Sequence, residues 1–598
     1  MDNQANVAVY SSGEILPAWD LSDLYDGIDS SDLTYDLTVA ASTADVFARD
    51  YMGKLAELGP DEFGDAIQEY EDLNELLSRI MSYAQLLFAA NSEDGEIATF
   101  YQDMSERVTA VSAKTLFFEL EINRLKDAEI KAFLSSASVV RYKPWLENVR
   151  VYKSYQLSDE VERLLHEKSV TGRSAWSRLF DETMAGLRFK LHGRELTNSE
   201  IMTRMSDPKE ANRKAASKAF AKGLEDNIKL FSLVTNTLAK DKEIEDTWRA
   251  LPRPVSSRNL GNQVEDDVVD ALSNSVRLAY PDLSHRYYQL KAEWMGKDVL
   301  NYWDRNAPLP EADHTRIEWP RAREAVLGSY AAFEPTLGQI AGQFFDKAWI
   351  DAAPRSGKNS GAFSHPTVPS AHPYILMNYH GKPRDVMTLA HELGHGIHQV
   401  LAAPQGHFLA NTPLTLAETA SVFGEMLTFQ FMLESAQDVT ARRVMLASKV
   451  EDMLNTVIRQ IAFYQFEERV HEERRQGELS ADRLGEIWME VQTDSLGPAF
   501  CYDDEYSYFW AYIPHFIHAP FYVYAYAFGD CLVNSLYDLF ANGHPQFQEK
   551  YLDMLKAGGT RRHKELLAPF GLDASNPAFW QRGLGVVSGF IDELEKIL

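Results

Sequence analysis

Apolar residues recur at three- and four-residue steps along much of the chain. Between Phe63 and Leu87 they form a continuous stripe of this spacing, which is typical of amphipathic helices. The same spacing of apolar residues extends over residues 37–134 and predicts an antiparallel helical bundle with short polar loops. We expect further helices at about 208–242, 265–294, 320–349 and 385–401.

Other segments favour strands and loops. Residues 187–196 alternate apolar and polar side chains about His192-Gly193, which predicts a small hairpin. Thr197 and Glu200 then have the spacing of a capping box for the next helix. Short strands are expected at 362–365 and 374–380, and the glycine- and serine-rich run 353–361 between them and the preceding helix predicts a mobile loop. Residues 1–30 are expected to form an extended arm.

The helix at 385–401 contains a candidate metal site. His391 and His395 stand four residues apart, so both imidazoles leave the same helix face. They can bind one tetrahedral Zn²⁺, and Glu392 is free to take a proton from water on the metal. A third protein ligand and an open position for water are then required. Gly394 and the nearby Gly396 each cost about 1 kcal/mol in a helix interior, which predicts a close backbone approach here.

A second apolar segment supplies the candidate third ligand. Thr412 and Pro413 predict a helix start, and the helix that follows is apolar almost all round. Glu418, Ser421 and Glu425 form a narrow polar stripe along it. Buried carboxylates need a cation or strong hydrogen-bond partners, so we expect Glu418 to bind the zinc ion. Ser421, Glu425 and His398 are candidates for orienting the metal ligands.

These motifs resemble the M3 family of zinc metallopeptidases and, within it, the oligoendopeptidase F branch. The resemblance rests on the segments His391–His398, Glu418–Ser421, Gly361–Ser364, Tyr374–Asn378, His515–Gly529 and Trp19–Tyr25. It implies a mainly α, two-lobed peptidase with a deep substrate channel and a small β-sheet beside the His-Glu helix. It also implies one zinc ion per chain, an N-terminal helical lobe over residues 1–204 and a catalytic domain over residues 205–598.

An aromatic segment near the C-terminus, residues 506–529, is a second candidate site. The resemblance implies that a histidine and tyrosines here bind substrate and stabilise the tetrahedral intermediate, with His515 and Tyr522 as first choices. His518, Tyr524 and, upstream, Tyr374 are candidate substrate contacts. A helical segment would place Tyr522 and Tyr526 on the face of His515 and His518, whereas an extended one would align Tyr522, Tyr524 and Tyr526. The segment lacks the glycine-rich sequence of thimet-type relatives. An aromatic stripe is also typical of a buried hydrophobic core.

Composition and charge indicate which partners and which cellular compartment the protein is expected to have. The chain has 598 residues and a formal net charge of −29, which argues against nucleic acid or an anionic membrane surface as partner. Two cysteines, too few for a disulfide framework, favour a reducing cytoplasm. The first residues have no signal-peptide pattern, and no apolar run is long enough to span a membrane. The sequence leaves the oligomeric state open.

The sequence therefore predicts a cytoplasmic zinc endopeptidase that acts on short, unstructured peptides. One alternative is a zinc carboxypeptidase or dipeptidyl carboxypeptidase on the same scaffold, in which Arg355 or Arg384 would bind a free C-terminal carboxylate. Another is a non-catalytic helical protein that binds peptides. The intact Glu392 argues against that second alternative.

Overall fold

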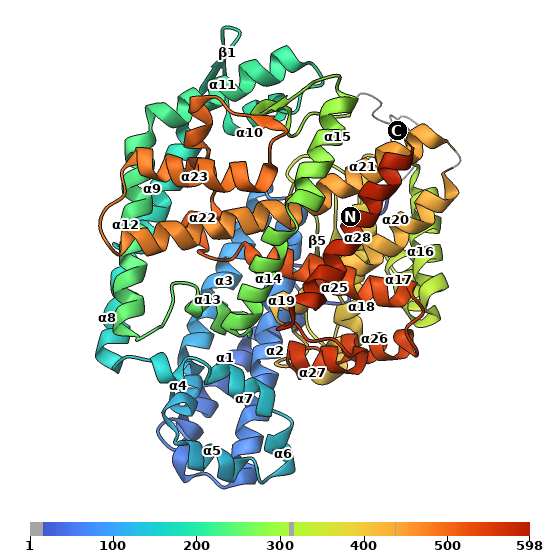
Figure 1. Cartoon of the computed structure of the whole chain (residues 1–598). Coiled ribbons are helices and arrows are strands. Elements are labelled where there is room, and N and C mark those ends of the chain that lie inside the picture. The colour runs from blue at the N-terminus through green and yellow to red at the C-terminus, as the bar shows by residue number, and fades with distance from the viewer. Residues whose placement is uncertain (1–15, 310–315, 437, 598) are drawn as a thin grey trace. The chain divides into compact units, whose positions relative to one another are not determined.

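The fold is mainly α-helical, as predicted (Figure 1). The structure is a computed structural model that describes residues 16–309, 316–436 and 438–597, so the first half of the expected N-terminal arm lies outside the described residues. The chain divides into two compact units. The first comprises Met1–Lys153, His314–Ser435 and Leu539–Gly571, and the second comprises Ser154–Asp313, Ala436–Asp538 and Leu572–Leu598. The domain boundary near residue 205 stays a prediction.

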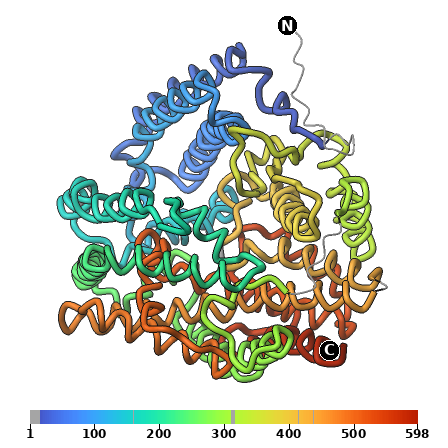
Figure 2. Tube along the Cα trace, turned by 90° about the horizontal axis from the view of Figure 1, so that it is seen from above, coloured from blue at the N-terminus to red at the C-terminus, as the bar shows by residue number. Residues whose placement is uncertain are grey.

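The first unit begins with three long helices that lie side by side (Figure 2). They are α1 (Ser31–Tyr51), α2 (Pro60–Ala90) and α3 (Gly95–Thr115). Ser30 and Asp94 cap α1 and α3 by accepting backbone N–H groups of the first turn. Short helices follow, and their apolar faces bury a shared core with α1 and α2. They are α4 (Phe117–Arg124), α5 (Asp127–Phe133), α6 (Ala137–Val140) and α7 (Lys143–Val149).

The rest of the first unit surrounds the central helix α18 (Pro383–Ala402). Helices α17 (Pro335–Asp346), α20 (Ser421–Ser435) and α26 (Phe547–Lys556) pack against it. Helix α16 (Trp319–Phe333) contacts α17, α18 and α20. Pro335 separates α16 from α17, where the sequence predicted one helix, because proline cannot donate the backbone hydrogen bond of a helix interior. The short helices α19 (Leu414–Ala417) and α27 (His563–Leu567) complete this unit.

A three-stranded sheet lies beside α18, as predicted. Its order is β4 (Ile350–Asp351), β6 (Tyr374–Leu376) and β5 (Phe363–His365), with β6 parallel to β4 and antiparallel to β5. Strand β6 therefore has partners on both sides. The position beside it is occupied by β4, a two-residue strand with no sequence signal, so no edge of β6 is open to a ligand.

The loop 353–361 is anchored instead of mobile. The Lys358 side chain is buried, and its Nζ donates to Asp351 Oδ1 (2.7 Å) and to the carbonyls of Asp351, Ala353 and Met377. Arg355 donates to both carboxylate oxygens of Asp351, at 2.7 and 2.6 Å. Asn359 N donates to the carbonyl of Ala89 in α2. The composition of this loop is typical of flexible loops, but the buried Lys358 fixes its conformation.

The second unit is also helical, apart from two small sheets. Its hairpin joins β1 (Phe189–Leu191) to β2 (Arg194–Leu196), and Thr197 and Glu200 form the predicted capping box. Helices α22 (Ile458–Arg474) and α23 (Ala481–Leu496) lie side by side and contact α12 (Figure 1). The other elements are α8 (Asp159–Ser169), α9 (Arg173–Gly186), α10 (Asn198–Arg204), α11 (Glu210–Asp226), α12 (Ile228–Trp248), α13 (Ser256–Gly261), α14 (Asp266–Leu278), α15 (Arg286–Trp294), β3 (Leu300–Asn301), α21 (Val439–Thr456), β7 (Phe500–Cys501), α24 (His515–His518) and α28 (Pro577–Lys596). Helix α25 (Tyr524–Ala541) begins in the second unit and ends in the first.

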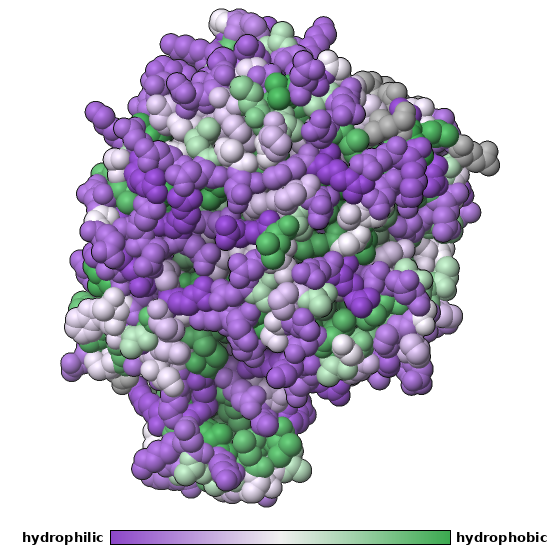
Figure 3. All heavy atoms as spheres, viewed as in Figure 1, coloured by the Kyte–Doolittle hydropathy of each residue, from purple (hydrophilic) through white to green (hydrophobic). Residues whose placement is uncertain are grey.

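The face of the molecule in Figure 3 is covered mainly by hydrophilic residues. Within the described residues no helix is both long and apolar enough to cross a membrane.

Candidate active site

Helix α18 presents His391 and His395 from one face. Pro383 occupies the first turn, and the Asp385 carboxylate accepts the backbone N–H groups of His380 and Lys382, which fixes the helix start. Farther along, the buried Tyr330 hydroxyl from α16 donates to the carbonyl of Ala390 (2.8 Å). The helix is thus held both at its start and next to the first histidine.

The predicted close approach at Gly394 is present. A Cβ built on Gly394 would lie 2.5 Å from Cα of Ser421 and would clash with the carbonyl oxygen of Ala420. Only glycine therefore lets α18 contact the backbone of the segment that carries Glu418. A Cβ on Gly396 would meet the Phe344 ring instead, at 2.6 Å from Cζ.

Glu418 lies in a turn rather than inside a continuous helix. Helix α19 ends at Ala417, α20 begins at Ser421, and Glu418 occupies the break between them. The Thr419 hydroxyl donates to the carbonyl of Leu416 (2.7 Å), and the buried Tyr551 hydroxyl of α26 donates to the carbonyl of Thr419 (2.9 Å). The expected single helix with Thr412 as N-cap is therefore wrong, because these hydroxyls stabilise the turn that α18 contacts.

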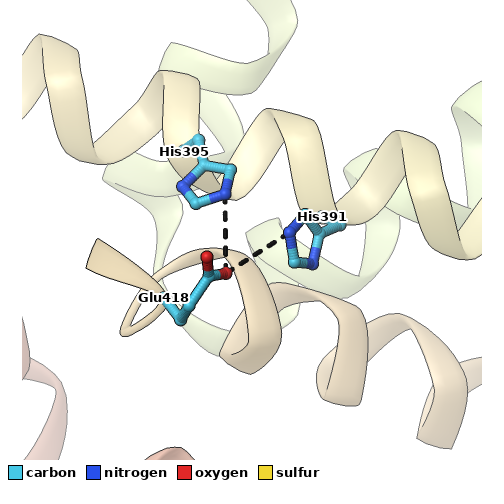
Figure 4. A group of neighbouring side chains, drawn as sticks. All are labelled: His391, His395 and Glu418. Atoms are coloured by element: carbon cyan, nitrogen blue, oxygen red, sulfur yellow. Dashed lines mark ion pairs between the residues drawn. The ribbon is translucent and has the colours of Figure 1, made fainter. Parts of the chain in front are cut away.

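His391, His395 and Glu418 come together as predicted. Figure 4 shows both imidazoles facing the Glu418 carboxylate. Oε2 of Glu418 lies 3.4 Å from Nε2 of His391 and 3.5 Å from Nε2 of His395, and the three ligand atoms all lie within 4.8 Å of one another. Tetrahedral ligands about 2.1 Å from zinc stand about 3.4 Å apart. The donor set and its spacing therefore fit one zinc ion.

The charges around the histidines also favour a cation. Burial lowers the pKa of His391, but the Glu425 hydrogen bond and the charges of Glu418 and Glu392 outweigh it and raise this pKa to about 9. Burial lowers the pKa of His395 to about 4, against the attraction of Glu418. The three carboxylates thus favour positive charge at this position, and a bound cation would supply it by displacing the proton of His391.

Glu392 is buried beside this cluster. Its side chain is 7% exposed. Burial raises the pKa of its carboxyl to about 7, although the charge of His391 lowers this pKa. A carboxyl with a pKa near neutrality can both accept and return a proton.

The three residues expected to orient the ligands have different contacts. Oε2 of Glu425 lies 3.3 Å from Nδ1 of His391, so this carboxylate can fix the imidazole that faces Glu418. Ser421 donates to Oε2 of Glu418 itself (2.7 Å) and not to a histidine. His398 is buried, and its Nε2 lies 3.2 Å from the Thr412 hydroxyl, so its role in orienting the ligands stays a prediction.

The second unit contains a separate cluster from the aromatic segment. Nε2 of His515 lies 3.3 Å from the Tyr526 hydroxyl, and the Tyr522 ring lies 6.0 Å from the imidazole and 5.3 Å from the Tyr526 ring. All three side chains are half-buried. Tyr526 lies in the first turn of α25, and Tyr522 lies in the turn just before that helix, which brings the two rings together.

Other predicted substrate contacts are engaged elsewhere. Tyr524 is fully buried and its hydroxyl accepts from Nδ2 of Asn262 (2.9 Å), so the structure places it in the core. Tyr374 is also fully buried and donates to the carbonyl of Asp20 (2.8 Å). Both expectations are wrong for the same reason, since neither hydroxyl is available to a ligand. His518 is exposed, and its Nε2 is paired with Asp181 at 2.8 Å.

Sequence reasoning did not assign roles to several residues that build these sites. Tyr330 and Tyr551 hold the two sides of the metal cluster through backbone carbonyls, and nothing in their local sequence marks them. Tyr526 could have been chosen, because it is in the same aromatic segment as His515 and Tyr522.

Comparisons with known proteins agree with this architecture. The model of Peptidase family M3 matches residues 330–586, and the model described as Oligopeptidase F matches residues 121–189. Oligopeptidase PepF of Bacillus subtilis is 25% identical over 92% of this chain and 82% of its own length. An oligoendopeptidase F homolog of Borreliella burgdorferi is 26% identical over 90% of this chain and 92% of its own.

Solved structures share the fold. The oligoendopeptidase F of Enterococcus faecium superposes with a TM-score of 0.69 at 22% identity, covering 95% of this chain and 97% of its own. A Chlamydophila abortus protein, provisionally assigned as a peptidase, superposes with a TM-score of 0.88 at 21% identity, covering 98% and 99% of the two chains. The chain belongs to peptidase family M3, in its oligopeptidase F group.

Proposed function

We propose that the chain is a zinc endopeptidase that hydrolyses internal bonds of short, unstructured peptides. The observation that carries this proposal is the meeting of His391, His395 and Glu418 at zinc-ligand spacing, with the buried Glu392 on the same helix. Membership of a metallopeptidase family and the names of the relatives support peptide hydrolysis. One zinc ion per chain is the simplest occupancy of a single three-ligand cluster.

The residues of the chain divide the chemistry between them. A bound zinc ion would polarise the scissile carbonyl and activate a water molecule. Glu392 takes the proton of that water and returns it to the leaving amine, which its near-neutral pKa allows. Glu425 holds Nδ1 of His391 so that Nε2 faces the ligand position. His515 and Tyr522, with Tyr526, are proposed to bind the substrate and to donate to the developing oxyanion.

Cleavage of a peptide blocked at both ends tests this function. An internally quenched peptide without free termini is incubated with the purified protein before chelation, after chelation and after zinc is restored. We expect internal cleavage that is lost on chelation and recovered with zinc. Cleavage only of peptides with a free C-terminus would favour the carboxypeptidase alternative, and zinc binding without cleavage would favour a peptide-binding protein.

The free cysteines bear on the cellular compartment, and the pairing of Arg355 bears on the carboxypeptidase alternative. Both cysteines, Cys501 and Cys531, are free, which supports the proposal of a reducing cytoplasm. Arg355, one of two arginines considered for a carboxypeptidase, is paired with Asp351 through both of its terminal nitrogens. Its terminal nitrogens are therefore already engaged by a buried carboxylate, which also accepts from Lys358.

A further inference from the structure

Two arginines of the second unit lack a carboxylate partner within residues 16–309, 316–436 and 438–597. Nη2 of Arg459, in α22, donates to the Tyr512 hydroxyl (2.8 Å), and its guanidinium lies 5.0 Å from the centre of the Phe463 ring. Nη2 of Arg305 donates to Oδ1 of Asn455 (2.9 Å). The Nε atom of each arginine is buried and has no acceptor. Both guanidinium groups therefore keep an uncompensated charge and unused donors.

Carboxylates outnumber basic groups in this chain, yet neither Arg459 nor Arg305 is paired with one in the part of the chain that the structure describes. The protein has 88 acidic and 59 basic residues, and other arginines of the same unit pair with carboxylates. Arg249 binds Glu162, Arg253 binds Asp270 and Arg483 binds Glu473. A partly buried cation without a counter-charge is costly. The planar guanidinium matches a carboxylate in both geometry and charge, so an acidic ligand would complete the site.

The unpaired charge lies beside the His515–Tyr522–Tyr526 cluster. Tyr512, the acceptor for Arg459, is only three residues before His515. The Phe463 ring under Arg459 contacts the ring of Phe516 at 5.5 Å. Burial lowers the pKa of His515, and the charge of Arg459 lowers it further. The charge of Arg459 therefore reaches the imidazole of the proposed substrate-binding cluster in the second unit.

We propose that Arg459 binds the C-terminal carboxylate of the peptide substrate. This inference rests on the proposed function and adds that short peptides with a free C-terminus are its preferred substrates. Every short peptide carries that carboxylate, whereas a backbone carbonyl has no net charge and would leave the arginines uncompensated. Arg305 adds a second positive charge near Tyr512, and the cut bond remains internal.

Three quenched peptides of one sequence test the assignment. The first has a free C-terminal carboxylate, the second a C-terminal amide, and the third an amide with glutamate as the last residue. The proteins are the wild type, Arg459→Gln, Arg459→Lys and the control Arg469→Gln. Arg469 is on the same helix but is paired with Glu490. We expect the wild type to favour the free acid on the order of tenfold in kcat/KM, mainly through KM.

The variants separate binding of the carboxylate from a structural role. Arg459→Gln should remove most of the preference for the free acid while changing amide cleavage far less, Arg459→Lys should restore part of it, and Arg469→Gln should keep it. No preference in the wild type, or an equal loss on acid and amide in Arg459→Gln, would overturn the proposal. A preference for the glutamate amide over the free acid would also overturn it, by assigning the site to an acidic side chain. If the wild type cuts none of the peptides, the proposed function itself fails.

Discussion

The contact between α18 and the Glu418 turn predicts a large effect from one added methyl group. In Gly394→Ala the new Cβ would lie 2.5 Å from Cα of Ser421, whereas real Cβ atoms essentially never approach closer than 3.0 Å. The turn must therefore move by at least 0.5 Å. Backbone on both sides of the contact leaves no flexible side chain to yield, so we expect a stability loss of about 1–3 kcal/mol.

The same movement would change the metal site. A shift of 0.5 Å away from α18 lengthens the distances of 3.4 and 3.5 Å between Glu418 and the two histidines, beyond the roughly 3.4 Å that tetrahedral zinc requires. Because a 1 Å misplacement can cost about 10²-fold in rate, we expect zinc affinity and kcat to fall at least about tenfold. Competition with a chelator of known affinity measures the first, and a quenched peptide at saturating zinc measures the second.

Two other glycines are matched controls. Gly396→Ala adds the same methyl group two residues along the helix, but against the Phe344 ring, so it should lower Tm with a smaller effect on zinc affinity. Gly342→Ala in α17 meets nothing within 4 Å and should be neutral or stabilising by up to about 1 kcal/mol. If Gly394→Ala keeps zinc affinity and kcat within twofold of the wild type, the close approach does not position Glu418.

Three further substitutions probe the surrounding contacts. Glu425→Gln weakens the hold on His391 and should lower zinc affinity about 10- to 100-fold in chelator competition without changing the far-ultraviolet circular dichroism; unchanged affinity would exclude that contact. Tyr551→Phe leaves the Thr419 carbonyl without its donor and should cost about 1–3 kcal/mol in urea unfolding, so an unchanged midpoint would refute the role of this hydroxyl. Burial raises the pKa of Glu467 from its usual 4.5 to about 8, so its stabilising contribution is complete below pH 4.5 and is lost as pH rises to about 8, by up to ~1.4 kcal/mol per pH unit. Glu467→Gln should flatten this decline in Tm, and an identical pH profile would contradict the burial of a protonated carboxyl.

Patterns of local origin were predictable from the sequence. The helix expected at 385–401 is α18, Pro383–Ala402, and the hairpin and its capping box occur where the turn residues place them. His391 and His395 were found from their four-residue spacing on one helix face, and Glu418 was found because a buried carboxylate in an apolar segment requires a partner. In each case the signal lies within a few residues, where periodicity and turn chemistry act.

Features that depend on distant contacts were not predictable. The break at Glu418 needs the Tyr551 hydroxyl and the glycine contact from α18, both distant in sequence. Strand β4 has two residues and no pattern, so the central position of β6 and the burial of Tyr374 could not be foreseen. Lys358 has the sequence context of a flexible loop, and only its four acceptors show that it is buried.

The most direct test of the central claim compares the wild type with Glu392→Gln. Cleavage of a quenched peptide blocked at both ends and bound zinc are measured in the same preparations. Since Glu392 is assigned to proton transfer and not to metal binding, the variant should keep one zinc ion per chain and lose about 10²–10⁴-fold in kcat. A zinc-loaded variant that cuts at nearly the wild-type rate would contradict the account, and so would a wild type that cuts peptides without bound metal.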